Sequence, residues 1–179
     1  SEEDRTIDQV IDSAGNIKSM VQALCDAFNC TPQALEPKLA DYSFAIRVGG
    51  ELFVRSIARI DYEHQIVQLY CDVAPGEELV MVRRTPLREA TRVDYEQFLR
   101  GKGGQPVAGI LNDCILRRLN NATELGSMAG TFGDVPLAGL STFGEILGLN
   151  LNQTLTAIFF FRVAKRSEER RVGKECPRC

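Results

Sequence analysis

The chain has 179 residues, of which 44% are hydrophobic and 25% charged, with a net charge of −3. These values match an average globular protein and exclude a collagen, a coiled coil and a mostly disordered chain. No apolar run reaches the roughly 18 residues of a membrane-spanning helix, and residues 1–15 lack a secretory signal. The acidic balance argues against a nucleic-acid partner. We therefore expect a cytoplasmic domain with no membrane span.

The N-terminal part of the chain is predicted to be helical. In segment 16–28 the apolar residues recur at helical spacing, and the polar sequence from Asn29 ends the helix. Thr31-Pro32 can begin a short second helix, because proline is favoured in the first turn. We expect two helices before the first strand.

An antiparallel meander is predicted next. From Tyr42 the apolar residues alternate with polar ones, and the glycine pair at 49–50 offers a tight hairpin turn. The returning strand is expected over 51–60, and further strands over 67–73 and 78–83. These strands pair with their neighbours in the chain.

The remaining part of the chain is predicted to combine helices with strands. The patterns indicate helices at 85–100 and 122–131, and strands at 106–111, 135–140 and 155–163. Asn112 or Asp113 is expected to cap a further helix. The long apolar run of the last strand favours a central position in the sheet. The sum is a single α+β domain with a mixed, largely antiparallel β-sheet packed with helices.

The last segment, 164–179, differs from the rest. From Arg166 it reads RSEERRVGKEC, which resembles the translation of a common sequencing adapter, and we expect it to be disordered. Its C-x-x-C pair, Cys176 and Cys179, supplies two of the four ligands of a structural zinc and is set aside with it. The other four cysteines have scattered spacing and are expected to be reduced thiols, namely Cys25, Cys30, Cys71 and Cys114.

The sequence carries no enzyme motif. His64, the single histidine, is expected in a solvated hairpin turn. Gly139 and Ser141 begin a segment like a nucleophile elbow, but one residue too many separates Ser141 from Gly144. No Walker loop, dinucleotide fingerprint or metal-ligand spacing occurs. We expect a protein that is not an enzyme and holds no cofactor.

Two segments are candidates for a ligand site. In the first, Asn112, Cys114 and Arg117 lie where a buried strand is expected to end and a helix to begin. Free N–H groups at a helix start attract anions, and a guanidinium can bind a carboxylate through two hydrogen bonds. The alternative is a buried structural cysteine beside solvent-facing arginines.

The second candidate segment follows the strand predicted at 135–140. Gly139 and Gly144 permit close approach of the backbone, and Phe143 and Glu145 lie in the loop. The alternative is an ordinary exit from a strand, with Glu145 in water. The ends of neighbouring strands are common ligand sites, so the two segments support each other.

In these residues the chain resembles the C-terminal part of the FIST family, a bacterial sensory domain. The most specific match is C-x-x-R at 114–117 followed by G-x-x-x-x-G-E at 139–145. The matching segments occur in family order, at 44–57, 72–76, 109–117, 136–145 and 152–156. The resemblance implies a FIST C-like ligand-sensing domain over 41–163, with 1–40 as a helical lead-in or linker from a missing N-terminal half.

The resemblance also implies a function. Such domains lie upstream of chemotaxis modules, histidine kinases or cyclic-nucleotide enzymes, and the expected function is a non-enzymatic input domain for a small ligand such as an amino acid. Arg117 would then take the carboxylate and Glu145 the amine. Two alternatives stay open: a haem-binding nitric oxide sensor, for which His64 matches no ligand motif, and a structural interaction module.

Overall fold

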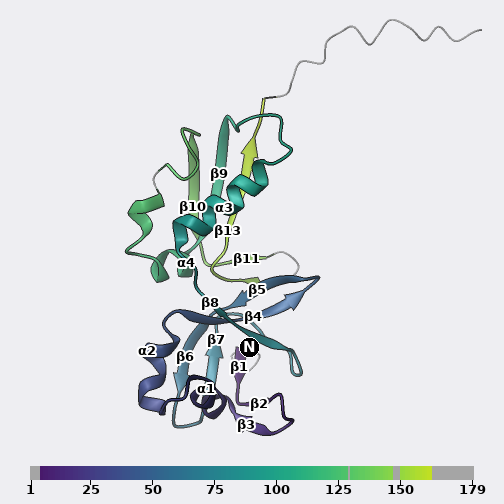
Figure 1. Cartoon of the computed structure of the whole chain (residues 1–179), viewed down its shortest axis with the longest axis vertical. Helices are drawn as coiled ribbons and strands as arrows, with labels where there is room; N and C mark the ends of the chain where they lie inside the picture. Colours follow the sequence, from purple (N-terminus) through teal and green to yellow (C-terminus); the bar gives the residue numbers. More distant parts are fainter. Residues whose placement is uncertain (1–4, 129, 147–149, 163–179) are drawn as a thin grey trace, which may run out of the picture.

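The computed structural model describes residues 5–128, 130–146 and 150–162. The adapter-like tail at 164–179 lies outside these residues. Figure 1 shows two groups of elements, an N-terminal half formed by residues 5–84 and a C-terminal half formed by 85–162. Several mostly antiparallel sheets combine with short helices, which confirms the predicted α+β class.

Within the described residues, three short strands precede the first helix of the expected helical lead-in. Strands β1 (Thr6–Ile7), β2 (Gln9–Ile11) and β3 (Ile17–Ser19) precede helix α1 (Met20–Phe28). The helix predicted from residue 16 therefore starts four residues later. The first residues of the predicted helix form β3 instead and pair with β2. The Ser19 hydroxyl caps the observed helix by accepting a hydrogen bond from the Gln22 N–H at 3.2 Å.

The second predicted helix is confirmed. The 3₁₀-helix η2 (Pro32–Ala34) leads into helix α2 (Leu35–Leu39). Helices α1 and α2 contribute to the core of the N-terminal half, where Leu35 and Val21 have no exposed surface. The other buried members of this core are Ile7, Met20, Leu24, Cys25, Leu39, Phe44, Val67 and Leu69.

The strands of the predicted meander are divided between two separate sheets. Strands β4 (Tyr42–Val48) and β5 (Glu51–Arg55) form the expected hairpin, whose turn glycines both have positive φ. The strand expected over 51–60 divides at the buried Ser56, and β6 (Ile57–Asp61) joins a different sheet. The two sheets have the orders β5-β4-β8 and β1-β7-β6, with β7 at Ile66–Leu69 and β8 at Leu79–Arg83.

A mixed sheet forms most of the C-terminal half. Strand β9 (Ala108–Cys114) lies between β10 (Leu137–Thr142), which is parallel to it, and β13 (Leu155–Phe160), which is antiparallel. The prediction of a central position for the last strand is wrong, because β13 is a sheet edge within the described residues. Its apolar character reflects packing on a helix: the Phe159 ring lies 5.2 Å from that of Tyr95.

Helices cover one side of this sheet (Figure 1). Helix α3 (Leu87–Leu99) agrees with its prediction, and α4 (Ile115–Asn120) follows β9 without a break. The helix expected at 122–131 is reduced to the 3₁₀-helix η3 (Leu125–Met128). The short strands β11 (Glu145–Ile146) and β12 (Asn150–Leu151) pair next to the N-terminal half. None of the described helices is long and apolar enough to cross a membrane.

Candidate functional site

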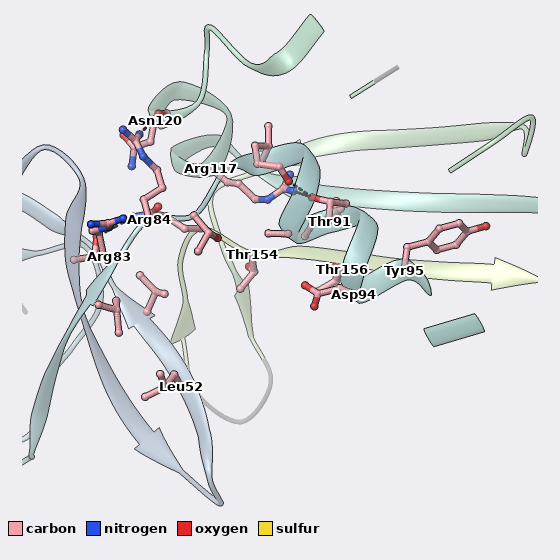
Figure 2. A pocket seen from close by; sticks show the side chains of 18 of the residues that line it. Leu52, Arg83, Arg84, Thr91, Asp94, Tyr95, Arg117, Asn120, Thr154 and Thr156 are labelled. Carbon is pink, nitrogen blue, oxygen red and sulfur yellow. Dashed lines mark hydrogen bonds between the residues drawn. The ribbon is translucent and has the colours of Figure 1, made fainter. Parts of the chain in front are cut away.

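A cleft of about 700 Å³ lies where the two halves meet (Figure 2). Strands β4, β5 and β8 form one wall, and α3, α4 and β13 form the other. Leu52, Val54 and Val82 make part of the first wall apolar. The second wall combines apolar with polar side chains, and those labelled from it in Figure 2 are Thr91, Asp94, Tyr95, Arg117, Asn120, Thr154 and Thr156.

Two of the arginines in the cleft are already bound within the protein. Arg84 forms an ion pair with Asp41 at 2.5 Å and also donates to the carbonyl oxygen of Asn120. Arg117 donates to the carboxylate of Asp113 at 2.8 Å and to the hydroxyl of Thr91 at 2.6 Å. These guanidinium groups join elements of the fold, and their charges are compensated.

The remaining charged pair of the cleft is Arg83 and Asp94. Arg83 ends β8 and Asp94 lies on α3, and Figure 2 shows them on opposite walls. Both residues are exposed, and neither side chain has a hydrogen bond or an ion pair among the described residues. The cleft thus offers one positive and one negative group to a molecule that enters it.

A second cavity, of about 440 Å³, shares a wall with the cleft. Tyr42, Ser43, Asn120 and Gln153 line both spaces. The Gln153 amide donates to the hydroxyl of Ser43 at 3.1 Å and to that of Ser56 at 2.8 Å, while its backbone has a φ of 55°. A residue other than glycine in this conformation is strained, so the surrounding contacts must hold it there.

Buried polar contacts hold the two halves together behind this wall. Arg55, which is 4% exposed, donates to the carbonyl of Asn150 at 2.7 Å. The thiol of Cys71 donates to the side-chain oxygen of Asn152 at 2.8 Å, and burial raises the pKa of this thiol. No local motif marks these residues as a site, although Arg55 and Asn152 lie in the family-like segments 44–57 and 152–156.

The helix cap predicted at Asn112 or Asp113 is wrong. Both residues lie in β9, where Asn112 pairs with Leu140 of β10 and with Thr156 of β13. Helix α4 begins only after Cys114, which is fully buried and gives no side-chain cap. Strand pairing on both sides therefore extends β9 through the residues that were expected to start the helix.

The two predicted glycines do allow close approach of the backbone. A Cβ atom on Gly139 would lie 2.4 Å from the carbonyl oxygen of Leu111, across the parallel strands. A Cβ atom on Gly144, whose φ is 135°, would lie 2.5 Å from the carbonyl oxygen of Leu151. The groups that approach are neighbouring strands, so packing accounts for both glycines.

Arg117 is the member of the predicted site that lines the cleft. Asn112, Cys114 and Phe143 are not among the described residues that line it, and Phe143 is 91% exposed. Glu145 is held in β11 by pairing with Leu151, and its side chain is outside what the structure describes. Arg83 and Asp94 also line the cleft but were not predicted, because no sequence motif distinguishes them from other surface charges.

His64 lies in the predicted turn, between β6 and β7. Its side chain is 67% exposed, and its Nδ1 atom lies 3.0 Å from the carboxylate of Asp61. It lines neither of the two cavities. Among the described residues, no group of three histidine, cysteine or acidic side chains has the arrangement of a metal site.

Comparison with protein families gives a match over residues 21–147, to the FIST C domain. The chain belongs to the FIST C domain family. FIST C is a sensory-type domain of signalling proteins and is not a known enzyme family. The same comparisons found no match among curated proteins and none among solved structures. The resemblance seen in the sequence is thereby confirmed, and the contacts above describe how this FIST C domain is built.

Proposed function

We propose that this FIST C domain is a non-enzymatic input module of a bacterial signalling protein, and that it binds a small molecule such as an amino acid in the cleft. The observation that carries the proposal is the uncompensated pair of Arg83 and Asp94 on opposite walls. Because Arg84 and Arg117 are bound by carboxylates of the protein, Arg83 is the cleft guanidinium that can receive an anion.

Each part of the cleft matches one part of such a ligand. A guanidinium binds a carboxylate through two parallel, charge-assisted hydrogen bonds, so Arg83 would hold the acid group. Asp94 attracts a positive group, and the apolar side chains of Leu52 and Val82 can cover a hydrocarbon part. In this proposal Arg117 has a structural role in the wall of the cleft. Arg83 binds the carboxylate of the ligand, which is the role that the sequence predicted for Arg117.

The experiment is a thermal-shift screen of the twenty amino acids, followed by calorimetry on the one that stabilises the domain most. That amino acid is compared with its methyl ester, which lacks the carboxylate, and with its N-acetyl form, which lacks the ammonium group. We expect Arg83→Gln to lower the affinity for the free amino acid about tenfold, which is about 1.4 kcal/mol. The variant should then no longer distinguish the free acid from the ester.

The matched control is Arg88→Gln, because Arg88 is an exposed arginine of α3 outside the cleft lining. This variant should bind as the unaltered domain does. Asp94→Asn should remove the preference for the free amine over the N-acetyl form. The proposed function is wrong if no amino acid stabilises the domain, or if Arg83→Gln binds with unchanged affinity.

The signalling context forms the second part of the proposal. We expect an N-terminal FIST half and a downstream module, such as a chemotaxis module or a histidine kinase, to be the partners of this domain. The test fuses the complete input region to a histidine kinase and measures autophosphorylation with the amino acid found in the screen. The rate should change for the unaltered fusion and stay constant for the Arg83→Gln fusion.

A further inference from the structure

The end of helix α1 brings two cysteines together. Asn29 follows the helix with left-handed backbone, at a φ of 46°. Its N–H donates to the carbonyl of Asp26 at 3.2 Å, and the N–H of Cys30 donates to the carbonyl of Cys25 at 3.0 Å. These two bonds define a Schellman helix end, in which the first and last side chains of the motif contact each other. In this protein both of those side chains are thiols.

The backbone geometry meets the first requirement of a disulfide. Two cysteines can form a disulfide only when their Cα atoms lie within about 7 Å of each other. With standard bond lengths, a hydrogen bond of 3.0 Å between the Cys30 N–H and the Cys25 carbonyl keeps the two Cα atoms within about that distance. The chain therefore needs no large movement to close a bond between these residues.

The two thiols differ in access to solvent. Cys25 is buried at 5% exposure, whereas Cys30 is half-buried at the edge of the core, and both are free. Burial, together with the neighbouring Cys30 thiol, raises the pKa of Cys25. An oxidant from solution thus meets Cys30 first, and Cys25 lies against it as the second thiol.

We propose that Cys25 and Cys30 form a reversible disulfide, which makes the end of α1 a redox-sensitive modification site. The oxidant is a low-molecular-weight disulfide, RSSR. The Cys30 thiolate attacks one sulfur of RSSR, so that a Cys30–S–S–R bond forms and RS⁻ leaves. The Cys25 thiolate then attacks the Cys30 sulfur and releases a second RS⁻. Two electrons pass from the cysteines to RSSR, and their two protons end on the released thiols.

Tryptic mapping tests the proposal, because Cys25 and Cys30 share one peptide and the other two cysteines of the described residues fall in two different ones. Segment 19–38 lies between two lysines and contains both Cys25 and Cys30, while Cys71 falls in 60–83 and Cys114 in 103–117. The full chain, with Cys176 and Cys179 changed to serine, is treated with oxidised glutathione, denatured and alkylated with iodoacetamide. The peptides are then compared by mass spectrometry.

After oxidation we expect peptide 19–38 to carry no alkyl group and to be two hydrogens lighter than the same peptide in its reduced, unalkylated form. Dithiothreitol should restore both groups. Cys71 and Cys114 have no exposed surface and should stay available to alkylation after denaturation, which makes them internal controls. The inference is wrong if peptide 19–38 of the oxidised protein carries two alkyl groups. It is also wrong if the peptide keeps a glutathione adduct that is not converted into the Cys25–Cys30 disulfide.

Two variants test the order of the steps. Cys25→Ser should keep glutathione on Cys30, since the second thiol is missing. Cys30→Ser should react at Cys25 at least tenfold more slowly, because that thiol is buried. Equal rates of adduct formation on both variants would overturn the assigned roles. If a variant does not fold, the mapping of the chain with native Cys25 and Cys30 still decides whether the bond forms.

Discussion

The guanidinium of Arg117 lies 2.8 Å from the carboxylate of Asp113, and this ion pair joins α4 to the end of β9. A second nitrogen of Arg117 donates to Thr91 on α3, so one side chain connects three elements of the C-terminal half. The two charged side chains are 12% and 23% exposed, which shields the pair from water. Removing one partner of this pair is therefore expected to cost more than removing one partner of a surface ion pair, because the other charge stays shielded and uncompensated.

Replacing Arg117 by alanine should destabilise the domain by about 2 kcal/mol, because Asp113 then keeps a shielded charge without its partner. Urea unfolding at pH 7 measures the change. The control is Arg118→Ala, since Arg118 is the exposed neighbour on the same helix. That variant should differ from the unaltered domain by less than about 0.5 kcal/mol. Equal losses for both variants would show that the ion pair is unimportant.

Gly139→Ala should destabilise the mixed sheet by about 2 kcal/mol, because the new methyl group meets the Leu111 carbonyl and must push β10 away from β9. Thermal unfolding followed by circular dichroism measures the shift in Tm. Gly126→Ala is the matched change, since a Cβ atom on Gly126 meets no atom within 4 Å. It should leave Tm nearly unchanged. A Gly139→Ala protein with the original Tm would contradict the described packing.

Gln153 should respond differently to alanine and to glycine. Both substitutions remove the hydrogen bonds to Ser43 and Ser56. Glycine also removes the strain of the positive φ, whereas alanine keeps it. We expect Gln153→Ala to cost about 2 kcal/mol and Gln153→Gly roughly 1 kcal/mol less. If the glycine variant is the less stable one in urea unfolding, the backbone at this position is not strained.

Asp12 makes the β2–β3 hairpin sensitive to acid. Its carboxylate accepts hydrogen bonds from the backbone and side chain of Asn16, which lower its pKa from 3.8 to about 2. A carboxyl with a lowered pKa in the folded state adds stability above pH 3.8, and this contribution is lost as the pH falls towards 2. Hydrogen exchange of the hairpin amides should therefore accelerate over this range.

The control for the acid response is Asp12→Asn, which cannot ionise. In this variant the hairpin amides should exchange at rates that no longer change specifically between pH 4 and pH 2, after correction for intrinsic exchange. The same acid response in both proteins would mean that another group causes it.

Local signals account for the elements that were predicted correctly. The glycine pair at 49–50 turns the β4–β5 hairpin, and Pro32 starts η2, because such residues act through their own backbone preferences. The division at Ser56 has no such signal. The apolar pattern runs on through 51–60, and Ser56 is held by Gln153, which lies 97 residues away in the chain. Contacts at that separation are invisible to a reading of local pattern.

The candidate site shows the same limit. Arg117 was predicted from its position near the expected end of a strand, and it does line the cleft, but its charge is compensated by Asp113. Arg83 and Asp94 are exposed charges on a regular strand and a regular helix, and nothing near them in the sequence distinguishes them. They form a pair only because the fold places β8 opposite α3. Predicting such a site requires the arrangement of the two halves.

The Gln153 contacts also bear on how the domain folds. They join this residue to Ser43 and Ser56 across 110 and 97 residues of chain. Closing loops of that length costs entropy that nearby contacts cannot repay, so both halves must already be folded when Gln153 finds its partners. Substitutions there should accelerate unfolding and leave the refolding rate nearly constant. The junction that contains the cleft is then the last part of the molecule to form.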